Sequence, residues 1–261
     1  CEDGQMLDEE VITKAIVEEY MRTFLENTDV EAALGGAGPA NLVAAKKLAE
    51  KGVKTAVYEE KLNVGGGMWG GGMMYPRIVV QEEAKRILKE FGINFSEYEK
   101  GYYVASSIES VARLASEAVK AGAEIFNLTK VEDVMVREDD HIAGVVLNWS
   151  AVEKANLHVD PLTVKADVVI DGTGHDAEIC RVTQRKIPDA DLQVRGEKPM
   201  WAEKGEKALM DTTKEVYPGL IVSGMAANAV SAGPRMGPVF GGMLLSGEKA
   251  AELALERIEE K

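Results

Sequence analysis

The first periodic segment of the chain spans residues 7–27. Its apolar side chains recur every three to four positions, with Glu and Lys between them: Val11, Ile12, Ala15, Ile16, Tyr20, Phe24 and Leu25. This spacing places side chains along one side of an α-helix. We therefore expect an amphipathic N-terminal helix at about residues 7–27 that covers the body of the protein.

The pattern changes in the next segment, EAALGGAGPANLVAAKKLAEKGVKTAVYEEK. A short apolar run at residues 31–34 leads into a glycine-rich turn, an alanine-rich helical pattern occupies residues 39–50, and a second apolar run occupies residues 55–58. Gly52 follows the helical pattern, where glycine commonly ends a helix. This order predicts a β–α–β unit.

Helical and strand-like patterns alternate through the rest of the chain. We expect helices at residues 81–91, 107–121 and 241–261, and strands at residues 93–95, 123–126, 130–137, 142–148, 168–171 and 220–222. The charged segment EDDH between two of these strands predicts a hairpin with His141 in its solvated turn. Such alternation indicates an α/β protein with a central parallel sheet.

We predict one domain with a Rossmann-like dinucleotide-binding fold. Residues 28–129 and 165–261 form the dinucleotide-binding core, and residues 130–164 form a smaller antiparallel insertion. A chain of 261 residues with 46% hydrophobic residues can bury such a core without disulfides or a structural metal.

The composition also limits the partners and the compartment. Acidic residues outnumber basic ones by 44 to 30, a formal net charge of −14 that disfavours nucleic acid and anionic membranes. No run approaches the roughly 18 apolar residues of a membrane span, and the acidic start does not resemble a signal peptide. Cys1 and Cys180 lie far apart and form no CxxC motif, as is typical of a reducing compartment. We therefore expect a cytoplasmic protein.

A degraded dinucleotide fingerprint lies between the first strand and the following helix. Gly36 and Gly38 stand where such a turn approaches a pyrophosphate at a helix N-terminus, and Glu59 ends the next strand, where a carboxylate binds the ribose hydroxyls. Asn41 replaces the third glycine, and the first strand is poor in β-branched residues. An ordinary β–α turn is therefore the alternative interpretation.

Two further loops have an unusual composition. Six of the eight residues in GGGMWGGG, residues 65–72, are glycine. A flexible surface loop is one interpretation, but Met68 and Trp69 would be unusual in a solvated linker, so we expect the loop to line a ligand site. In SAGPRMGPVFGGM, Arg235 lies between two Gly/Pro pairs and is suited to bidentate binding of a carboxylate or phosphate, with an ordinary exposed arginine as the alternative.

Residues 155–161, ANLHVDP, place His158 and Asp160 two positions apart. In a strand these side chains would face the same way, although an ordinary strand end before Pro161 is the alternative. His175, in DGTGHDAE, follows a predicted buried strand, where open parallel sheets bind ligands. Asp160 and His175 could meet there, with Asp176 as a less favoured substitute. Such an open oxygen and nitrogen ligand set suits ferrous iron better than a closed zinc site.

These motifs together resemble a known family. GAGPANL, GGGMWGGGM, NWSAVE followed by HVDP, DGTGHDAE, EVYPGLIVSGM and RMGPVFGGM resemble the thiazole synthases of thiamine biosynthesis, in particular the archaeal, sulfide-using branch. The resemblance extends from about Leu7 to the C-terminus. It implies a transferase-type enzyme that uses NAD as a substrate and builds it, with glycine and free sulfide, into an adenylated thiazole carboxylate with the help of Fe(II).

The resemblance also implies roles for individual residues. Asp160 and His175 bind iron and, with His158, form the catalytic set; Glu59 holds the adenosine ribose, and Arg235 binds the glycine carboxylate. The implied nucleotide contacts are Gly36, Gly38, Ala40, Glu59, Glu60, Gly67, Val131, His158 and Met225. The family forms rings of subunits, so we expect a homo-oligomer, an octamer, with sites shared between subunits and Asp160 reaching into a neighbour.

His158 carries the main mechanistic implication. The fungal and plant branch has at this position a cysteine that gives up its own sulfur and is spent in one turnover. With histidine, sulfur must come from outside, and the enzyme can turn over repeatedly where sulfide and reduced iron are available. The implied steps are loss of nicotinamide, opening and isomerisation of the ribose to a ketone, imine formation with glycine, sulfide addition, cyclisation and loss of water. His158 is also a candidate proton shuttle.

Two positions depart from the family pattern, and two other functions stay open. Ala40 replaces a small hydroxyl residue, and Glu60 replaces a basic residue, which puts a negative charge near the expected pyrophosphate. Either NAD binds more weakly or another group supplies positive charge. The same β–α–β start and the late GLIVSGM strand also occur in flavin-dependent oxidoreductases, and a non-catalytic nucleotide-binding protein is the third possibility.

Overall fold

A mostly parallel sheet forms the centre of the computed structural model, which describes residues 7–137, 140–187 and 189–260. Five strands pair in parallel in the order β11-β9-β1-β2-β6, and β10 adds to the outer edge of β11 in the antiparallel sense. Their bounds are β1 Asp29–Gly35, β2 Thr55–Glu59, β6 Glu124–Asn127, β9 Leu162–Asp171, β10 Glu215–Tyr217 and β11 Leu220–Val222. The predicted α/β class with a central parallel sheet is confirmed.

Strand β9 connects this sheet to an antiparallel hairpin. Its first residues pair with β8 (His141–Trp149), which pairs with β7 (Thr129–Arg137), whereas its second half pairs with β1 and β11. The predicted antiparallel strands therefore exist but continue the main sheet. Two residues of the predicted turn, Glu138 and Asp139, lie outside the described residues, and so does Cys1 at the start of the chain. His141 begins β8 and is half-buried, so the prediction that it lies in a solvated turn was wrong.

Helices cover both faces of the sheet, as a parallel sheet requires. One face packs against α2 (Pro39–Glu50), α4 (Ser107–Ala121) and α9 (Gly241–Glu259). The other packs against the β7–β8 hairpin, α6 (Glu178–Lys186) and α8 (Gly224–Ser231), with α7 (Ala202–Thr212) between α8 and α9. The central strand β1 is alanine-rich because the elements beside it approach closely: a Cβ on Gly35 would lie 2.3 Å from a methyl carbon of Ile179.

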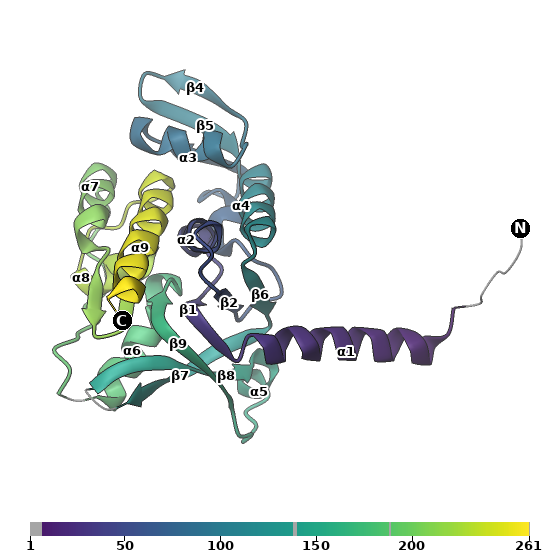
Figure 1. Cartoon of the computed structure of the whole chain (residues 1–261). Helices are drawn as coiled ribbons and strands as arrows, with labels where there is room; N and C mark the ends of the chain where they lie inside the picture. The colour runs from purple at the N-terminus through teal and green to yellow at the C-terminus, as the bar shows by residue number, and fades with distance from the viewer. Residues whose placement is uncertain (1–6, 138–139, 188, 261) are drawn as a thin grey trace, which may run out of the picture.

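A second, three-stranded antiparallel sheet lies apart from the main sheet (Figure 1). It comprises β3 (Arg77–Val80), β5 (Tyr102–Ser106) and β4 (Phe95–Glu99), with η2 (Glu82–Ala84) and α3 (Lys85–Glu90) between β3 and β4. The sequence predicted a longer helix at residues 81–91 and missed β3 and β5. These strands are short. The strand predicted at residues 93–95 shares only Phe95 with β4, because the later residues of β4 are exposed and form no apolar run.

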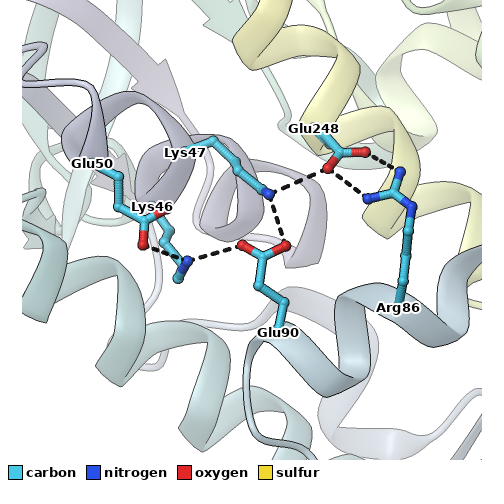
Figure 2. Close-up of polar contacts among 6 residues, drawn as sticks. All are labelled: Lys46, Lys47, Glu50, Arg86, Glu90 and Glu248. Carbon is cyan, nitrogen blue, oxygen red and sulfur yellow. Dashed lines mark hydrogen bonds and ion pairs between the residues drawn. The ribbon is translucent and has the colours of Figure 1, made fainter.

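An ion-pair network joins α3 to the main body (Figure 2). Glu90 accepts from Lys46 and Lys47 of α2, at 2.9 and 2.7 Å. Lys47 also reaches Glu248 of α9, which pairs with Arg86 of α3. The Lys46 side chain is only 7% exposed, so removing its carboxylate partners would cost more than breaking an ordinary surface pair.

The N-terminal helix α1 (Glu9–Glu26) projects away from the rest of the molecule (Figure 1). It begins at Asp8, whose carboxylate accepts from the Glu10 and Val11 amides. Phe24 is its one buried residue, so the predicted helix is present, but the prediction that it covers the body was wrong. Its exposed large apolar side chains are Val11, Ile12, Ile16, Val17, Tyr20, Met21 and Leu25. No helix within the described ranges is long and apolar enough to span a membrane.

Candidate functional site

A cavity of about 1340 Å³ opens at the carboxyl ends of β1, β2 and β9. This is the edge at which open parallel sheets bind ligands. Ten of the predicted site residues line it: Gly36, Gly38, Ala40, Glu59, Glu60, Gly67, Val131, His175, Met225 and Arg235. The structure therefore gathers them around one cavity, and their individual binding roles stay predictions.

The turn between β1 and α2 forms the floor of this cavity. Gly36 has a φ of +83°, and a Cβ there would lie 2.7 Å from the Gly172 carbonyl oxygen. Gly38 is the N-cap of α2 and has no side chain to cover the free amides of the first turn. Asn41, which replaces the third glycine, is fully buried; its Nδ2 donates to the Gly35 and Gly36 carbonyls. Its Oδ1 accepts from Ser223 Oγ at 2.8 Å, so the departure from the fingerprint stabilises the turn.

The acidic end of β2 is fixed by backbone contacts. Glu59 is 5% exposed, and its two carboxylate oxygens accept from the Ala37 and Lys61 amides at 2.8 and 2.9 Å. Lys61 Nζ lies 3.6 Å from Glu60. Lys130 also lines the cavity, next to Val131. Glu60 stands where the family has a basic residue. Neither lysine can be recognised from the sequence as a replacement for that positive charge, because both lie in otherwise ordinary charged segments.

The glycine-rich loop is ordered against the body of the protein. Residues Gly66–Gly70 form the short helix η1, and the Gly65 amide donates to the Ala37 carbonyl at 2.7 Å. Met68 is fully buried in the core, and Trp69 Nε1 donates to the Val64 carbonyl. The loop lines the cavity through Gly66, Gly67, Met68 and Gly72, and Met73, which follows it, does so too. Trp69 is not among the lining residues.

His175 stands on a tightly hydrogen-bonded loop after β9. Asp171, fully buried, accepts from the Thr173 amide and hydroxyl through Oδ1 and from the Cys180 amide through Oδ2. Thr173 Oγ1 in turn accepts from the Glu178 amide. Burial, together with the Asp171 carboxylate, raises the pKa of the Cys180 thiol. This loop places His175, with a side chain 56% exposed, on the cavity wall.

Two polar residues that the sequence analysis missed contact this histidine directly or indirectly. Glu197 Oε2 lies 2.5 Å from His175 Nδ1, and Asn228 Nδ2 donates to Glu197 Oε1 at 2.8 Å. Glu197 belongs to an irregular segment between α6 and α7 and Asn228 to an alanine-rich helix. Neither has a spacing that identifies it, since the contact depends on the tertiary fold.

The Arg235 loop closes another side of the cavity. Its backbone pairs with the segment that carries Glu197, through Arg235 N to Lys198 O at 3.1 Å and Lys198 N to Gly233 O at 2.9 Å. Arg235 is exposed toward the cavity, and its guanidinium forms no ion pair within the described part of the chain. This guanidinium is therefore free to bind an anionic group.

His158 and Asp160 do not join the cavity of their own chain. Residues 157–161 form an irregular, exposed loop between α5 (Ser150–Lys154) and β9, so no strand aligns His158 with Asp160, and the segment agrees with the alternative interpretation, an ordinary strand end at Pro161. This loop precedes β9, whereas His175 follows it, and a ten-residue strand spans about 30 Å at roughly 3.3 Å per residue. The prediction that Asp160 and His175 meet within one chain is therefore wrong, because they lie beyond opposite ends of β9.

A metal ion consequently finds too few ligands in one chain. Within residues 7–260, masked positions aside, no group of three or more His, Cys, Asp and Glu side chains is arranged to hold one. His175, with Asp176 beside it on the cavity wall, offers a partial set. A histidine nitrogen and a carboxylate oxygen are ligand types that ferrous iron accepts, and a complete site requires further ligands.

The fold and the position of the cavity define the chain as a Rossmann-like α/β protein of the dinucleotide-binding class. The family model described as the Thi4 family matches residues 13–240. The chain therefore belongs to the Thi4 family, and the predicted resemblance to thiazole synthases is confirmed at the level of the family. This membership supports the predicted enzyme class, a thiazole synthase.

The chain is similar to curated relatives over nearly its whole length. It is 66% identical over 255 residues to the thiamine thiazole synthase of Methanococcoides burtonii, covering 97% of this chain and 99% of the relative. It is 53% identical over 254 residues to the thiamine thiazole synthase of Pyrococcus furiosus, with the same coverage.

Solved structures agree with this assignment. THI4 of Thermovibrio ammonificans matches with a TM-score of 0.95 at 46% identity, over 98% of this chain and 100% of that chain. A geranylgeranyl bacteriochlorophyll reductase-like protein from Thermoplasma acidophilum matches with a TM-score of 0.55 at 15% identity, over 89% and 79%. The second likeness shows a shared fold alone.

Proposed function

We propose that this chain is a sulfide-dependent thiamine thiazole synthase that converts NAD, glycine and free sulfide into an adenylated thiazole carboxylate, with Fe(II), over repeated turnovers. The observation that carries the proposal is the histidine at position 158, where the resemblance places the sulfur-donating cysteine. The one cysteine among the described residues, Cys180, is fully buried beneath the β9–α6 loop. Neither residue is suited to surrender sulfur to a substrate.

The cavity supports NAD as the substrate. Its volume of about 1340 Å³ exceeds that of ordinary small-molecule pockets and suits a dinucleotide. The α2 N-terminus at Gly38 binds the pyrophosphate, Glu59 accepts from the ribose hydroxyls through its remaining lone pairs, and Gly67 and Met225 pack on the nucleotide. Lys61, whose ammonium nitrogen lies 3.6 Å from Glu60, offsets the negative charge of that residue.

The part of the cavity lined by His175 and Arg235 receives glycine and the metal. Arg235 binds the glycine carboxylate in a bidentate contact. His175 of one subunit and Asp160 of a neighbour hold ferrous iron. When bound, the metal orients sulfide and polarises the substrate as a Lewis acid, while His158, on the same loop as Asp160, moves protons.

Exposed apolar surface supports the shared arrangement. The α1 helix carries seven large apolar side chains in water, and the loop with His158 and Asp160 adds Leu157 and Val159. Contiguous exposed apolar surface commonly marks a protein–protein interface. A ring of identical subunits, for which we expect an octamer, covers this surface and brings the Asp160 loop to the cavity of a neighbour.

One reaction tests the chemistry. The purified protein is incubated without air with NAD, glycine, sulfide and Fe(II), and the products are analysed by mass spectrometry for an adenylated thiazole. We expect more than one product molecule per protein chain, and none when sulfide is omitted. Product without added sulfide, or no product at all, contradicts the proposal, and a bound flavin spectrum would instead favour the oxidoreductase.

A mixing experiment tests the shared site. Asp160→Ala and His175→Ala are each expected to be inactive alone, because each lacks one ligand in every site. Subunits of the two variants, dissociated and reassembled together, recover part of the activity, since some sites then contain both native ligands. Activity that does not return on mixing, with each variant still assembled by light scattering, contradicts the sharing of Asp160.

A further inference from the structure

Three residues from separate segments form a hydrogen-bonded chain that ends at the cavity. Asn228 of α8 donates to Glu197 Oε1, and Glu197 Oε2 contacts Nδ1 of His175. The same Asn228 amide also donates to the Pro234 carbonyl at 3.2 Å, next to Arg235. These hydrogen bonds therefore fix His175 relative to the loop that carries Arg235.

The exposed fraction of the side chain rises from Asn228 through Glu197 to His175. Asn228 is fully buried, the Glu197 side chain is 17% exposed, and the His175 side chain is 56% exposed. The carboxylate is thus anchored from behind; Glu197 and His175 both line the cavity, and the imidazole is the more exposed of the two side chains. Since a carboxylate accepts hydrogen bonds, the proton of this contact lies on His175 Nδ1.

We propose that Glu197 is a positioning residue that holds His175 in the Nδ1–H tautomer, so that the Nε2 lone pair faces the cavity and is free to bind a metal ion. The metal part of this inference rests on the proposed function. A free neutral imidazole carries its proton mainly on Nε2, which would block that nitrogen. Hydrogen bonding of the other ring nitrogen to a carboxylate is a common way of orienting a metal-binding histidine.

The neighbouring carboxylates offer a matched comparison. Glu178 also lines the cavity, but its side chain pairs with Lys130, at 3.4 Å, and not with His175. Glu178→Gln removes a carboxylate from the same cavity without touching the histidine. It therefore separates an effect of cavity charge from an effect of His175 orientation.

The first measurement needs no metal. The full chain has three histidines, His141, His158 and His175, so nitrogen-15 NMR of the metal-free protein, above the imidazole pKa, resolves each ring. We expect the Nδ1–H form for His175 in the wild type and in Glu178→Gln, and a shift to the Nε2–H form in Glu197→Ala. A wild-type His175 with its proton on Nε2 overturns the proposal.

The second measurement is a titration with Co(II), a spectroscopic substitute for Fe(II). We expect Glu197→Ala to weaken binding about 10- to 100-fold and Glu178→Gln to bind as the wild type does. Wild-type affinity in Glu197→Ala, with affinity lost in His175→Ala, overturns the positioning role alone. Unchanged affinity in His175→Ala instead removes the metal ligand of the proposed function, while the NMR experiment still decides whether Glu197 sets the tautomer.

Discussion

Glu206 of α7 is a buried carboxyl group with an unusual setting. Its Oε2 accepts from the Gly242 amide at 2.6 Å, at the start of α9. Its Oε1 and the Gln81 Oε1 are both buried acceptors with no hydrogen-bond partner among the described residues. Burial, assisted by the nearby Glu83, raises the pKa of Glu206 to about 7. A proton on this carboxyl group also supplies a donor where two acceptors lack one.

The raised pKa predicts a pH-dependent stability. The ordinary value for this group is 4.5, and a difference of about 1.4 kcal/mol per pH unit gives about 3 kcal/mol in total. Between pH 4.5 and 7 the folded chain binds more protons at Glu206 than the unfolded chain does. The contribution to stability is therefore complete below pH 4.5, falls as pH rises through this window, and is lost above pH 7.

Glu206→Gln removes this titration and retains the hydrogen bonds. The amide oxygen can accept from Gly242, and the amide nitrogen can donate to Gln81. The difference in unfolding free energy, variant minus wild type, should therefore rise by about 3 kcal/mol between pH 4.5 and pH 8, in favour of the variant.

Urea denaturation at fixed protein concentration over this pH range measures the difference. Glu203→Gln, one turn earlier on the exposed side of α7 and paired with Lys207, is the control and should show no such rise. A difference in unfolding free energy that stays constant with pH for Glu206→Gln would refute the reasoning, because it would mean that the pKa of Glu206 is the same in the folded and the unfolded protein.

Three further substitutions test packing and polar contacts. Asn41→Ala should lower the unfolding free energy in urea by about 3 kcal/mol, because three buried polar groups lose a partner at roughly 1 kcal/mol each; a loss well below 1 kcal/mol would contradict this. Gly247→Ala should lower the melting temperature, since its Cβ would lie 2.0 Å from the Ala40 carbonyl oxygen, whereas Gly67→Ala, with no atom within 4 Å, should not; equal effects would count against close packing of α9 on α2. Glu90→Gln, which removes the carboxylate shared by Lys46 and Lys47 and leaves them paired with Glu50 and Glu248 (Figure 2), should cost about 1 kcal/mol at low salt and less in 1 M salt, and a loss independent of salt would exclude an electrostatic origin.

The sequence predicted the cavity residues well where a strand end and a turn residue coincide. Gly36, Glu59 and His175 each follow a recognisable parallel strand, and all such strand ends meet at one edge of the sheet. Asn41 was interpreted only as a departure from a glycine pattern. Its hydrogen bond to Ser223 depends on α8, which begins directly after Ser223 and which the sequence pattern did not locate.

The length of β9 explains the main error at the site. Only Val168, Val169 and Ile170 form a continuous apolar run, whereas the first part, LTVKA, alternates because one side is exposed. The predicted strand was therefore too short, and Asp160 was expected near His175. Glu197 and Lys130 were missed for another reason, since a polar side chain acquires its partner from distant segments and leaves no local pattern.

The buried Cys180 provides an internal reporter of the loop beneath His175. Its thiol is covered while Asp171 and Thr173 hold the β9–α6 connection closed, so an alkylating reagent can attack it only when that connection opens. In a Cys1→Ser background, the rate of alkylation would measure the opening free energy of this segment directly. Protection that increases when ligands are added would reveal that occupation of the cavity and closure of the loop are thermodynamically linked.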